Sequence, residues 1–310
     1  MNKSKRPLED LRPALVFLNG DLLAVPIPLE REEVILGRAL EADVRVNDAK
    51  TSRKHARINA VTDGENNTTY ILTDLSSRNG TLLNGERVRQ EILQNGDKIT
   101  IGEHILRFEF LDEIDREFHR QIHRLLSHDD LTGLLSSRSF FSELRRESAR
   151  AKAEGRPFCV LMMDVDFFKN VNDTYGHLTG SKTLEEIGYC IMQNLRSGDV
   201  ASRFGGEEFA AFLLHAEIGQ GLVAAERIRS EIENTEFTVI RQGKPAEKHH
   251  VTISIGVASF PADSSDVIEL VEMADSALYR AKREGRNRIC AYRDLKPEET
   301  IKPLPSRQET

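Results

Sequence analysis

The hydrophobic pattern of the chain changes near residue 111, and this change limits the fold more than any other feature. From residue 15 to 111 the sequence consists of short strand-like runs, such as LVFLNG and EVILGR, punctuated by Asn-Gly and Asp-Gly pairs. These pairs tolerate the positive φ angles of tight turns, so the first half predicts an all-β sandwich. After Leu131 helical and strand-like patterns alternate, which predicts an α/β or α+β domain.

Length and composition set outer bounds on the function. A chain of 310 residues has room for about two domains, each with its own core. The net charge of −7 argues against nucleic acid as the main partner. No window reaches the roughly 20 apolar residues of a membrane span, and the start MNKSKRPLEDLRPA lacks the apolar core of a secretory signal. The cysteines have no metal-ligand spacing and are expected to be buried thiols, so we expect a cytoplasmic protein.

The segment 111–128 has the pattern of a helix that joins the two domains. Its apolar residues recur at steps of three and four, which leaves one narrow apolar seam about two heptads long. The seam residues are Leu111, Ile114, Phe118, Ile122 and Leu125. Two interpretations fit: a helix packed on its own domain, and a stalk that dimerises. We also expect a flexible arm over 1–13 and a disordered, Pro-rich tail over 294–310.

Carboxylates interrupt apolar strand patterns at two places in the second half. Asp164 and Asp166 end the apolar run FCVLMMDVD, where an ionised side chain is costly unless a hard cation or a salt bridge neutralises it. The run FGGEEF breaks a second strand pattern with two glycines and two glutamates, and an ordinary hairpin turn with a charged tip is the alternative interpretation. Paired strands lie about 4.8 Å apart, so neighbouring strands would let Asp164 and Glu207 share a cation.

Two cationic side chains lie further along the same half. Lys282 and Arg286 stand four residues apart on one expected helix, and they are therefore expected to face the same way. Two such cations suit a polyphosphate, and a solvated helix surface is the alternative. The pair becomes informative only together with the carboxylates.

The stretch 129–293 resembles the GGDEF family of cyclic-dinucleotide synthases, the diguanylate cyclases. The resemblance rests on four motifs in the family order, DDLTGLLSSR, MDVDFFKNVNDTYGHLTG, RFGGEEF and ADSALYRAKREGRNRI. It implies an α/β domain with a central, mostly antiparallel sheet flanked by helices. It also implies a homodimer that brings two GTP molecules face to face. Each ribose 3′-hydroxyl then attacks the α-phosphate of the other nucleotide, and cyclic di-GMP and pyrophosphate are released.

The resemblance also implies roles for single residues. Two Mg²⁺ or Mn²⁺ ions per active site would be held by Asp164, Glu207 and the carbonyl of Val165, and such ions supply the charge neutralisation that phosphoryl transfer needs. Asn172 would read guanine, and Glu208 would assist deprotonation of the 3′-hydroxyl. The groups that would bind the triphosphate or make room for the nucleotide are the backbone amides near Phe167 and Phe168, the side chains of Lys282 and Arg286, and the glycines Gly205 and Gly206.

Ser181 departs from the family pattern, which has an aspartate after the last glycine of GHLTG. An aspartate accepts from both guanine N1–H and the 2-amino group, whereas a serine hydroxyl cannot match this bidentate acceptor. Serine at this position is similar to a minority branch of the family that also uses ATP and makes cyclic GMP-AMP. Both a GTP enzyme with weaker base contacts and a mixed-product cyclase fit the sequence.

The stretch RSGD precedes GGEEF at the distance of the family's RxxD inhibitory site. The resemblance implies that Arg196 and Asp199 bind the product cyclic di-GMP and so inhibit the enzyme. An arginine and an aspartate three residues apart at a helix end are also common by chance, and a plain helix end is the alternative.

The first half resembles the forkhead-associated (FHA) domain over about residues 20–110, and we expect this domain over 14–110. The landmarks are GR at 37–38, SRKHA at 52–56, SSRNGT at 76–81 and NGERV at 84–88. The resemblance implies a phosphothreonine-peptide module. A degenerate sandwich used only for dimerisation is the alternative. The residues expected to contact the phosphopeptide are Arg38, Ser52, Arg53, Arg78 and Asn79, whereas His55 is expected to be structural.

Three functions compete on this basis. The first is a nucleotide cyclase gated by phosphopeptide binding and coupled through the 111–128 helix, and the intact metal- and phosphate-binding set favours it. The second is an inactive cyclic-dinucleotide receptor, and the third is a phosphothreonine-dependent scaffold. The phosphopeptide would come from a partner or from the protein's own ends, where Ser4, Thr300 and Thr310 are candidate acceptors.

Overall fold

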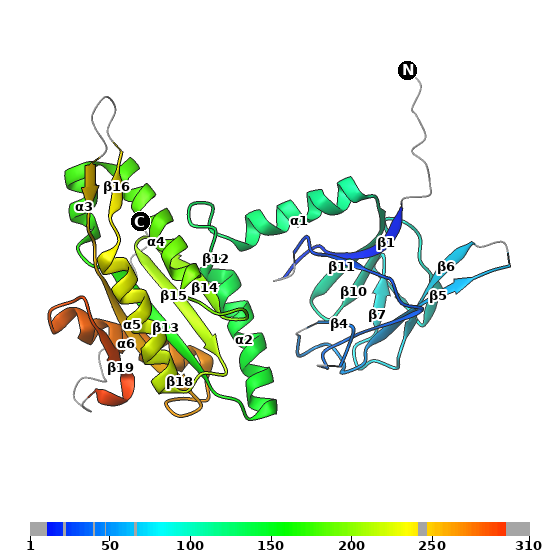
Figure 1. The fold of residues 1–310 in the computed structure, drawn as a ribbon. Coiled ribbons are helices and arrows are strands. Elements are labelled where there is room, and N and C mark those ends of the chain that lie inside the picture. Colours follow the sequence, from blue (N-terminus) through cyan, green and yellow to red (C-terminus); the bar gives the residue numbers. More distant parts are fainter. Residues whose placement is uncertain are drawn as a thin grey trace, which may run out of the picture. The chain divides into compact units, whose positions relative to one another are not determined.

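The computed structural model of the protein describes residues 11–20, 23–39, 41–46, 48–64, 67–240 and 247–295. The chain divides into two compact units between Leu126 and Ser127. Figure 1 shows a first unit made of strands and a second unit in which helices surround a sheet, as the change of pattern predicts. Most of the expected arm and tail, with Ser4, Thr300 and Thr310, lies outside the described residues.

The first unit is a sandwich of two sheets, which confirms the fold predicted for this half. One sheet contains, in order across it, β2 (Pro26–Pro28), β1 (Arg12–Phe17), β11 (His104–Leu111), β10 (Lys98–Ile101), β7 (Thr81–Leu83) and β8 (Glu86–Val88). The other contains β4 (Val44–Arg45), β3 (Glu33–Gly37), β5 (Ala56–Thr62), β6 (Thr68–Asp74) and β9 (Gln90–Ile92). Both sheets contribute to one apolar core, which includes Phe17, Leu36, Ile58, Leu72 and Phe108.

Helix α1 (Glu113–Ser127) confirms the helix predicted after the sandwich, although Leu111 belongs to β11 instead. Two histidines of α1 contact the sandwich and the loop after β1. His123 Nδ1 lies 3.2 Å from the Leu23 carbonyl oxygen. His119 Nε2 lies 3.7 Å from a carboxylate oxygen of Glu109 in β11. This face of α1 therefore packs on its own domain, as one of the two interpretations requires.

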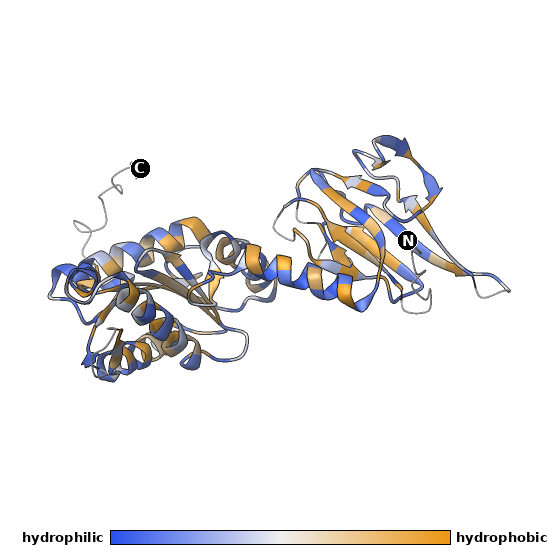
Figure 2. Ribbon diagram, turned by 90° about the horizontal axis from the view of Figure 1, so that it is seen from above, coloured by the Kyte–Doolittle hydropathy of each residue, from blue (hydrophilic) through white to orange (hydrophobic). Residues whose placement is uncertain are grey.

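The apolar seam of α1 is exposed. Ile114 is 71% exposed, Phe118 57% and Leu125 67%. In Figure 2 hydrophobic and hydrophilic bands alternate along this helix. An exposed apolar seam of this length is typical of a helix that binds a second helix.

The second unit is built on a six-stranded, mostly antiparallel sheet. Across the sheet the strands are β12 (Leu135–Ser136), β14 (Val200–Gly205), β15 (Glu208–Leu214), β13 (Phe158–Val165), β18 (Ile253–Phe260) and β19 (Ile289–Ala291). The central pairs are antiparallel, whereas the pairs β12–β14 and β18–β19 at the two edges are parallel. β16 (Phe237–Val239) and β17 (Glu247–His249) form a separate hairpin.

Helices cover both faces of this sheet. They are α2 (Ser137–Glu154), α3 (Phe168–Tyr175), α4 (His177–Gln193), α5 (Ile218–Asn234) and α6 (Val267–Arg283). Residues of α4 and α5 share one core with alternate residues of β13, and residues of α2 and α6 share another with the intervening ones. Because β13 is buried on both faces, its sequence is an almost unbroken apolar run. No helix in the described parts of the chain is long and apolar enough to cross a membrane.

A glycine sets the distance between α6 and the sheet. A Cβ atom at Gly256 of β18 would lie 2.0 Å from the carbonyl oxygen of Ala274 in α6. Only glycine therefore permits this close packing of helix on strand. The contact matters for the site, because the C-terminal end of α6 carries Lys282 to the end of β13.

Candidate functional sites

The first candidate site surrounds Asp164, which lies next to the last residue of β13. Its side chain is largely buried and stands opposite Glu208 of β15 and Ser254 of β18 in the strand register. Lys282 Nζ lies 2.7 Å from Asp164 Oδ2. Burial raises the pKa of the Asp164 carboxyl, the ion pair with Lys282 opposes the rise, and the charges of Glu208 and Asp166 add to it. The site therefore concentrates negative charge in a poorly solvated place.

The GGEE sequence forms the hairpin turn between β14 and β15. β14 ends at Gly205 and β15 begins at Glu208, so the interpretation as a turn describes the local structure correctly. The turn also places Glu207 beside the end of β13, where the Val165 N–H donates to the Glu207 carbonyl oxygen over 3.2 Å. Burial raises the pKa of the Glu207 carboxyl, and the negative charge of Asp164 raises it further. The two carboxylate sequences thus lie on neighbouring strands, as expected.

Arg203 and Asp129 hold this turn, although no sequence pattern indicated a role for either residue. Arg203 Nε and Nη2 donate to the Gly206 carbonyl oxygen over 2.9 and 2.7 Å. Arg203 Nη1 lies 3.2 Å from Asp129 Oδ2. Both residues belong to the motifs RFGGEEF and DDLTGLLSSR, but the two are 74 residues apart and no local pattern pairs them.

The carboxylates of Asp164 and Glu207 fit a Mg²⁺ ion. In proteins Mg²⁺ is usually bound by one or two carboxylates, and substrate phosphates and water complete its coordination. The described residues contain no group of three His, Cys, Asp or Glu side chains placed to hold a metal by themselves. Burial and the charge of neighbouring carboxylates raise the pKa of both carboxyl groups, and a divalent cation would relieve that charge.

The turn after β13 brings the expected phosphate contacts together. Phe167 has a left-handed backbone with φ of 55°, and α3 begins directly after it at Phe168. Turns of this kind can direct successive backbone N–H groups at an anion. The guanidinium carbon of Arg286 lies 4.4 Å from the centroid of the Phe167 ring, a cation–π contact. Arg286 thereby lies beside the backbone amides of Phe167 and Phe168, with which it was expected to bind the triphosphate.

The structure corrects the expected placement of Arg286 on a helix. Helix α6 ends at Arg283. The next residues turn sharply, because Gly285, Arg286 and Asn287 have φ angles of 117°, 62° and 46°. The glycine ends the helix, since it adopts this conformation without strain. Arg286 therefore does not share a helix face with Lys282, and the two cations reach the end of β13 by separate routes along the chain.

Asp166 differs from the expectation of a bound cation or a salt bridge. Its carboxylate accepts the hydroxyl groups of Thr252 and Ser254, each over 2.7 Å, and the backbone N–H of Asn287 over 3.0 Å. Three donors satisfy a buried carboxylate without a cation. The donors follow Asp166 by 86 residues or more, so the sequence pattern around Asp166 does not reveal them.

Asn172 and Ser181, the two expected base contacts, lie on successive helices. Asn172 belongs to α3 and Ser181 to α4, and Gly176 alone separates the two helices. A Cβ atom at Gly180 would come within 1.9 Å of Asn172 Oδ1. Gly180 therefore allows Asn172 to lie against α4, next to the residue that precedes Ser181. The structure thus places Asn172 against the residue that precedes Ser181.

The RSGD sequence forms a tight turn after α4. Asp199 Oδ2 accepts the Arg196 N–H over 2.9 Å, and the Asp199 N–H donates to the Arg196 carbonyl oxygen over 3.0 Å. Asp199 Oδ1 accepts the Leu214 N–H over 3.1 Å and so ties the turn to β15. The carboxylate therefore has a structural role, and a role of the pair in product binding stays a prediction.

The second candidate site is formed by loops of the sandwich. The Arg38 N–H donates to the Ser52 carbonyl oxygen over 3.0 Å. The Arg78 N–H donates to Ser52 Oγ over 3.0 Å, and Asn79 Nδ2 donates to the Lys50 carbonyl oxygen over 2.6 Å. Three loops, after β3, β4 and β6, thus bring together four of the five residues expected to contact a phosphopeptide.

Close packing and a buried histidine hold these loops. A Cβ atom at Gly37 would lie 2.1 Å from the Arg53 carbonyl oxygen, so the glycine lets two loops touch. His55 is fully buried, its Nδ1 accepts the Ser52 N–H over 3.1 Å, and its Nε2 therefore donates to the Gly80 carbonyl oxygen over 3.0 Å. These contacts agree with the structural role expected for His55. Contact of the Arg53 side chain with a ligand stays a prediction.

Comparison with known proteins assigns both units to families. The family model described as diguanylate cyclase, GGDEF domain, matches residues 126–288, which is more than half of the chain. The FHA domain model matches residues 34–102. The two matches lie in the order of the two units.

Curated relatives match the second unit. Diguanylate cyclase A of Treponema denticola is 38% identical over 180 residues, which are 57% of this chain and 47% of that protein. Diguanylate cyclase DosC of Escherichia coli K12 is 40% identical over 175 residues, which are 56% of this chain and 37% of that protein. The match therefore spans less than half the length of each relative.

Solved structures support the fold of the second unit. The coiled coil and GGDEF domain of DgcB from Caulobacter crescentus, in complex with c-di-GMP, has 32% identity and a TM-score of 0.53 and covers 58% of this chain and 92% of that one. The diguanylate cyclase SiaD from Pseudomonas aeruginosa, in complex with its activator SiaC, has 33% identity and a TM-score of 0.51 and covers 58% and 66%.

Proposed function

The chain belongs to the GGDEF family of diguanylate cyclases and carries an FHA domain, and we propose that it condenses two GTP molecules into cyclic di-GMP with release of two pyrophosphates. The observation that carries the proposal is the pair of crowded carboxylates next to the turn at Phe167, Asp164 at the end of β13 and Glu207 in the turn between β14 and β15. Relatives named diguanylate cyclases support it.

Two Mg²⁺ or Mn²⁺ ions per active site would be held by Asp164, Glu207 and the carbonyl of Val165. Such ions neutralise phosphate charge and make the attacking hydroxyl more acidic. The protein's own contribution is to hold the donors in place. The register of β13 against β15 sets the spacing of the carboxylates, and Arg203 fixes the turn that carries Glu207.

The triphosphate would be bound by the turn after β13. Backbone amides at Phe167 and Phe168 and the guanidinium of Arg286 would contact the β- and γ-phosphates. Lys282, which pairs with Asp164, would share its charge with the phosphates when the nucleotide binds. The absence of side chains at Gly205 and Gly206 would leave room for the nucleotide beside the turn.

Base choice and proton transfer would use residues on either side of this turn. Asn172 would hydrogen-bond the guanine edge, held in place by its contact with Gly180. Glu208, which stands opposite Asp164 in the strand register, would take the proton of the 3′-hydroxyl. The oxygen then bonds to the α-phosphorus of the other nucleotide as pyrophosphate leaves.

Two copies of the chain would meet to place two nucleotides face to face. The exposed seam of Ile114, Phe118 and Leu125 on α1 supports such a homodimer, because the opposite face of the helix already packs on its own domain. The oligomeric state in solution, measured by light scattering for the full chain and for Phe118→Glu, tests this point. A monomer in both cases would contradict it.

Product inhibition would use Arg196 and Asp199. Because Asp199 already holds the turn, Arg196→Ala is the cleaner variant. It should raise the cyclic di-GMP concentration that halves the rate. An unchanged inhibition curve would leave RSGD as a helix end only.

Phosphopeptide binding to the first unit would regulate the cyclase, through Arg38, Ser52 and the loop of Arg78 and Asn79. Arg38→Ala should weaken binding of a phosphothreonine peptide by about 2–5 kcal/mol, the range for truncating one partner of a charged pair. Calorimetry with a phosphothreonine peptide library measures the effect. Equal binding by both proteins would contradict the assignment.

A second candidate product is cyclic GMP-AMP, and the observation that favours it is Ser181 beside Gly180 and Asn172. An equimolar mixture of ATP and GTP should then yield cyclic GMP-AMP beside cyclic di-GMP. Ser181→Asp should shift the products toward cyclic di-GMP by about ten- to a hundredfold, since a carboxylate accepts both guanine donors. Pure cyclic di-GMP under excess ATP would exclude this candidate.

One experiment separates the main proposal from its competitors. The purified full chain is incubated with GTP and Mg²⁺, and the products are resolved by chromatography. Cyclic di-GMP supports the proposal. Binding of cyclic di-GMP without turnover would instead indicate a receptor, and neither turnover nor binding would leave a phosphothreonine-dependent scaffold.

A further inference from the structure

The turn that carries Arg286 has an unusual backbone. Gly285, Arg286 and Asn287 follow one another with φ angles of 117°, 62° and 46°. A left-handed conformation is unfavourable for residues other than glycine and persists only where the surroundings hold it. The surroundings of this turn therefore decide where the Arg286 side chain lies.

The first support comes from Asp166. Its carboxylate accepts the Asn287 N–H over 3.0 Å and is itself fixed by the hydroxyl groups of Thr252 and Ser254. A second backbone contact lies just before it, because the Arg286 N–H donates to the Ala281 carbonyl oxygen over 3.0 Å. The backbone N–H groups on both sides of the Arg286 side chain are thus anchored.

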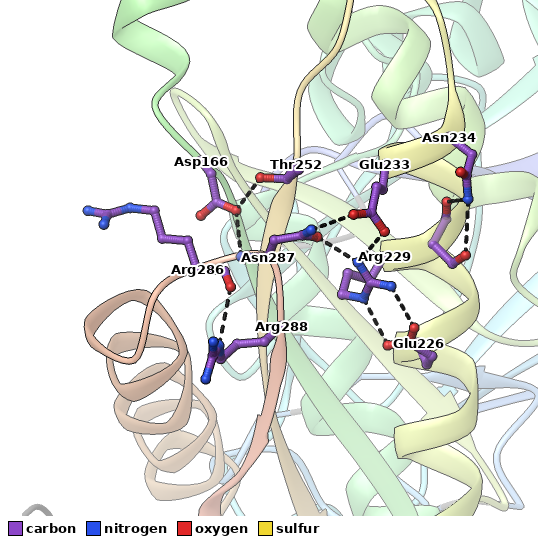
Figure 3. A network of polar contacts seen from close by, with 10 residues as sticks. Asp166, Glu226, Arg229, Glu233, Asn234, Thr252, Arg286, Asn287 and Arg288 are labelled. Atoms are coloured by element: carbon purple, nitrogen blue, oxygen red, sulfur yellow. Dashed lines mark hydrogen bonds and ion pairs between the residues drawn. The ribbon is translucent and has the colours of Figure 1, made fainter.

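The second support comes from helix α5. Asn287 Nδ2 donates to Glu233 Oε1 over 2.6 Å, and Asn287 Oδ1 accepts from Arg229 Nη1 over 2.6 Å. Arg229 also donates to Glu233 and, through two nitrogens, to Glu226. The hydrogen bonds to Glu226 and Glu233 raise the pKa of Arg229, and the donors Arg229 and Asn287 lower the pKa of Glu233, so both stay ionised. Figure 3 shows the Asn287 side chain directed at α5.

The Arg286 side chain leaves the turn on the other side. Figure 3 shows it extending away from the side chains of α5. Its guanidinium carbon lies 4.4 Å from the Phe167 ring centroid, beside the turn that follows β13. Asp166 links the turn after β13 to the turn that carries Arg286. Its own N–H donates to the Thr252 carbonyl oxygen, and its carboxylate accepts the Asn287 N–H.

We infer that Asn287 is a positioning residue, which places the Arg286 guanidinium over the turn after β13 that would bind the triphosphate. Asp166 holds the backbone N–H of Asn287, and the Arg229–Glu233 pair of α5 holds its side chain. The inference rests on the proposed function and deepens it, since it concerns how Arg286 reaches the phosphates of the nucleotide. Without the clamp Arg286 would lose its left-handed turn and would bind phosphate in several poorly aligned conformations.

The test uses Asn287→Gly in the full chain. Glycine keeps the left-handed backbone and the N–H that Asp166 accepts, and it removes only the two side-chain contacts with α5. The probe is a GTP analogue with a methylene group between the α- and β-phosphorus atoms, which binds and cannot be cyclised. Calorimetry with Mg²⁺ should show about tenfold weaker binding, which corresponds to about 1.4 kcal/mol.

A double-mutant cycle separates positioning from general stability. If Asn287 acts through Arg286, then Arg286→Ala should weaken binding at least as much, and the double variant should bind no more weakly than Arg286→Ala alone. Additive losses would overturn the inference, because they would mean that Asn287 acts independently of Arg286. Equal binding by the wild type and Asn287→Gly would overturn it as well.

Two further variants guard against misfolding and non-specific effects. Asn234→Ala is the matched control, because Asn234 lies next to Glu233 on α5 and its side-chain amide donates to Ser230 of the same helix, and binding by this variant should match the wild type. Arg229→Lys keeps the charge and loses the forked donors, so a smaller loss with the same non-additivity is expected. Unchanged binding by Arg229→Lys, with Asn287→Gly unfolded, would overturn the inference.

Failure of the proposed function gives a different result. If the wild type does not bind the analogue at all, the nucleotide site itself is absent and the proposed function fails. If the wild type binds and the variants bind equally well, the proposed function stands and only the positioning role of Asn287 fails.

Discussion

Asp164 and Asp166 lie two residues apart at the end of one strand, and their surroundings are opposite in kind. The two are almost equally buried, at 7% and 5% exposure. Asp164 faces one cation, Lys282, and its pKa is raised by burial and by the negative charges of Glu208 and Asp166. Asp166 instead accepts three hydrogen bonds.

The difference teaches that burial of a carboxylate is not by itself a sign of a metal or a catalytic group. What separates the two residues is the supply of donors. Where donors surround the carboxylate, it stabilises the structure and holds a turn in place. Where other carboxylates surround it, the site stores unfavourable charge that a cation or a phosphate-bound metal can relieve. The two sides of this contrast are tested by the variants Glu207→Gln, Asp166→Asn and Asp164→Asn.

The largest effect is expected for Glu207→Gln, on the side of the contrast that stores charge. Turnover of GTP should fall by more than about a hundredfold, the scale for removing a group that stabilises transition-state charge. The rate of cyclic di-GMP formation measures it. Glu272→Gln on the exposed face of α6 is the control. Retention of more than a few per cent of the control's activity would remove Glu207 from the metal-binding set.

Asp166→Asn should destabilise the second unit by about 2 kcal/mol, because an amide cannot accept all the hydrogen bonds that the carboxylate receives and its charge is lost. For a domain of this size the unfolding temperature should fall by roughly 4–8 °C. Scanning calorimetry without divalent cations measures the change. A variant as stable as the wild type would mean that the three donors are equally well satisfied by water.

Gly180→Ala should weaken nucleotide binding about tenfold, the equivalent of about 1.4 kcal/mol. The added Cβ would displace Asn172 Oδ1, which lies 1.9 Å from its position, and so disturb the expected guanine contact. Gly219→Ala in α5 is the matched control, because a Cβ there meets no atom within 4 Å. Calorimetry with the GTP analogue compares the two. Equal affinities would show that Asn172 does not read the base.

The smallest effect, and one of opposite sign to Asp166→Asn, is expected for Asp164→Asn without metal. The pKa of Asp164 is raised from its ordinary value of 3.8, so its ionised form costs folding free energy at neutral pH. The variant should therefore be more stable at pH 7 by about 0.5 kcal/mol, the lower end of the range for single stabilising substitutions.

The pH dependence provides the check on Asp164→Asn. A carboxyl with a raised pKa favours folding only while it is protonated, and that contribution is lost as the pH rises through the folded-state pKa. The stability gain should thus be largest near pH 7 and vanish as the pH falls toward 4. A gain that is constant with pH would point to packing, and a loss at pH 7 would mean that the Lys282 ion pair dominates.

Much of the fold could be read from local patterns. The Asn-Gly turns and short strands of the first half predicted the sandwich, and the apolar run of β13 predicted a strand buried on both faces. The seam of α1 was visible as a spacing of three and four. What the patterns misjudged was the end of α6, because the left-handed turn after Gly285 is held by Asp166 and α5, which are remote in sequence.

Some residues of the candidate sites could likewise be predicted from local patterns, and others could not. The motifs brought out Asp164, Glu207 and Asn172 because these residue types stand in unusual places, such as a carboxylate ending an apolar strand. They did not bring out Arg203, Asp129 or Asn287, whose partners are distant in the chain. Charged surface residues are common, and only their position in space distinguishes these three.

The sequence by itself determined the two families, the order of the two units and the residue types available for metal and phosphate, because these depend on composition, period and short motifs. Only the tertiary structure decided that Asp164 and Glu207 crowd together, that Asp166 does not share their role, and that Arg286 reaches Phe167 from a strained turn. The physical reason is that the state of a buried charge depends on which donors and charges surround it. Those neighbours are chosen by strand pairing and helix packing across the whole unit.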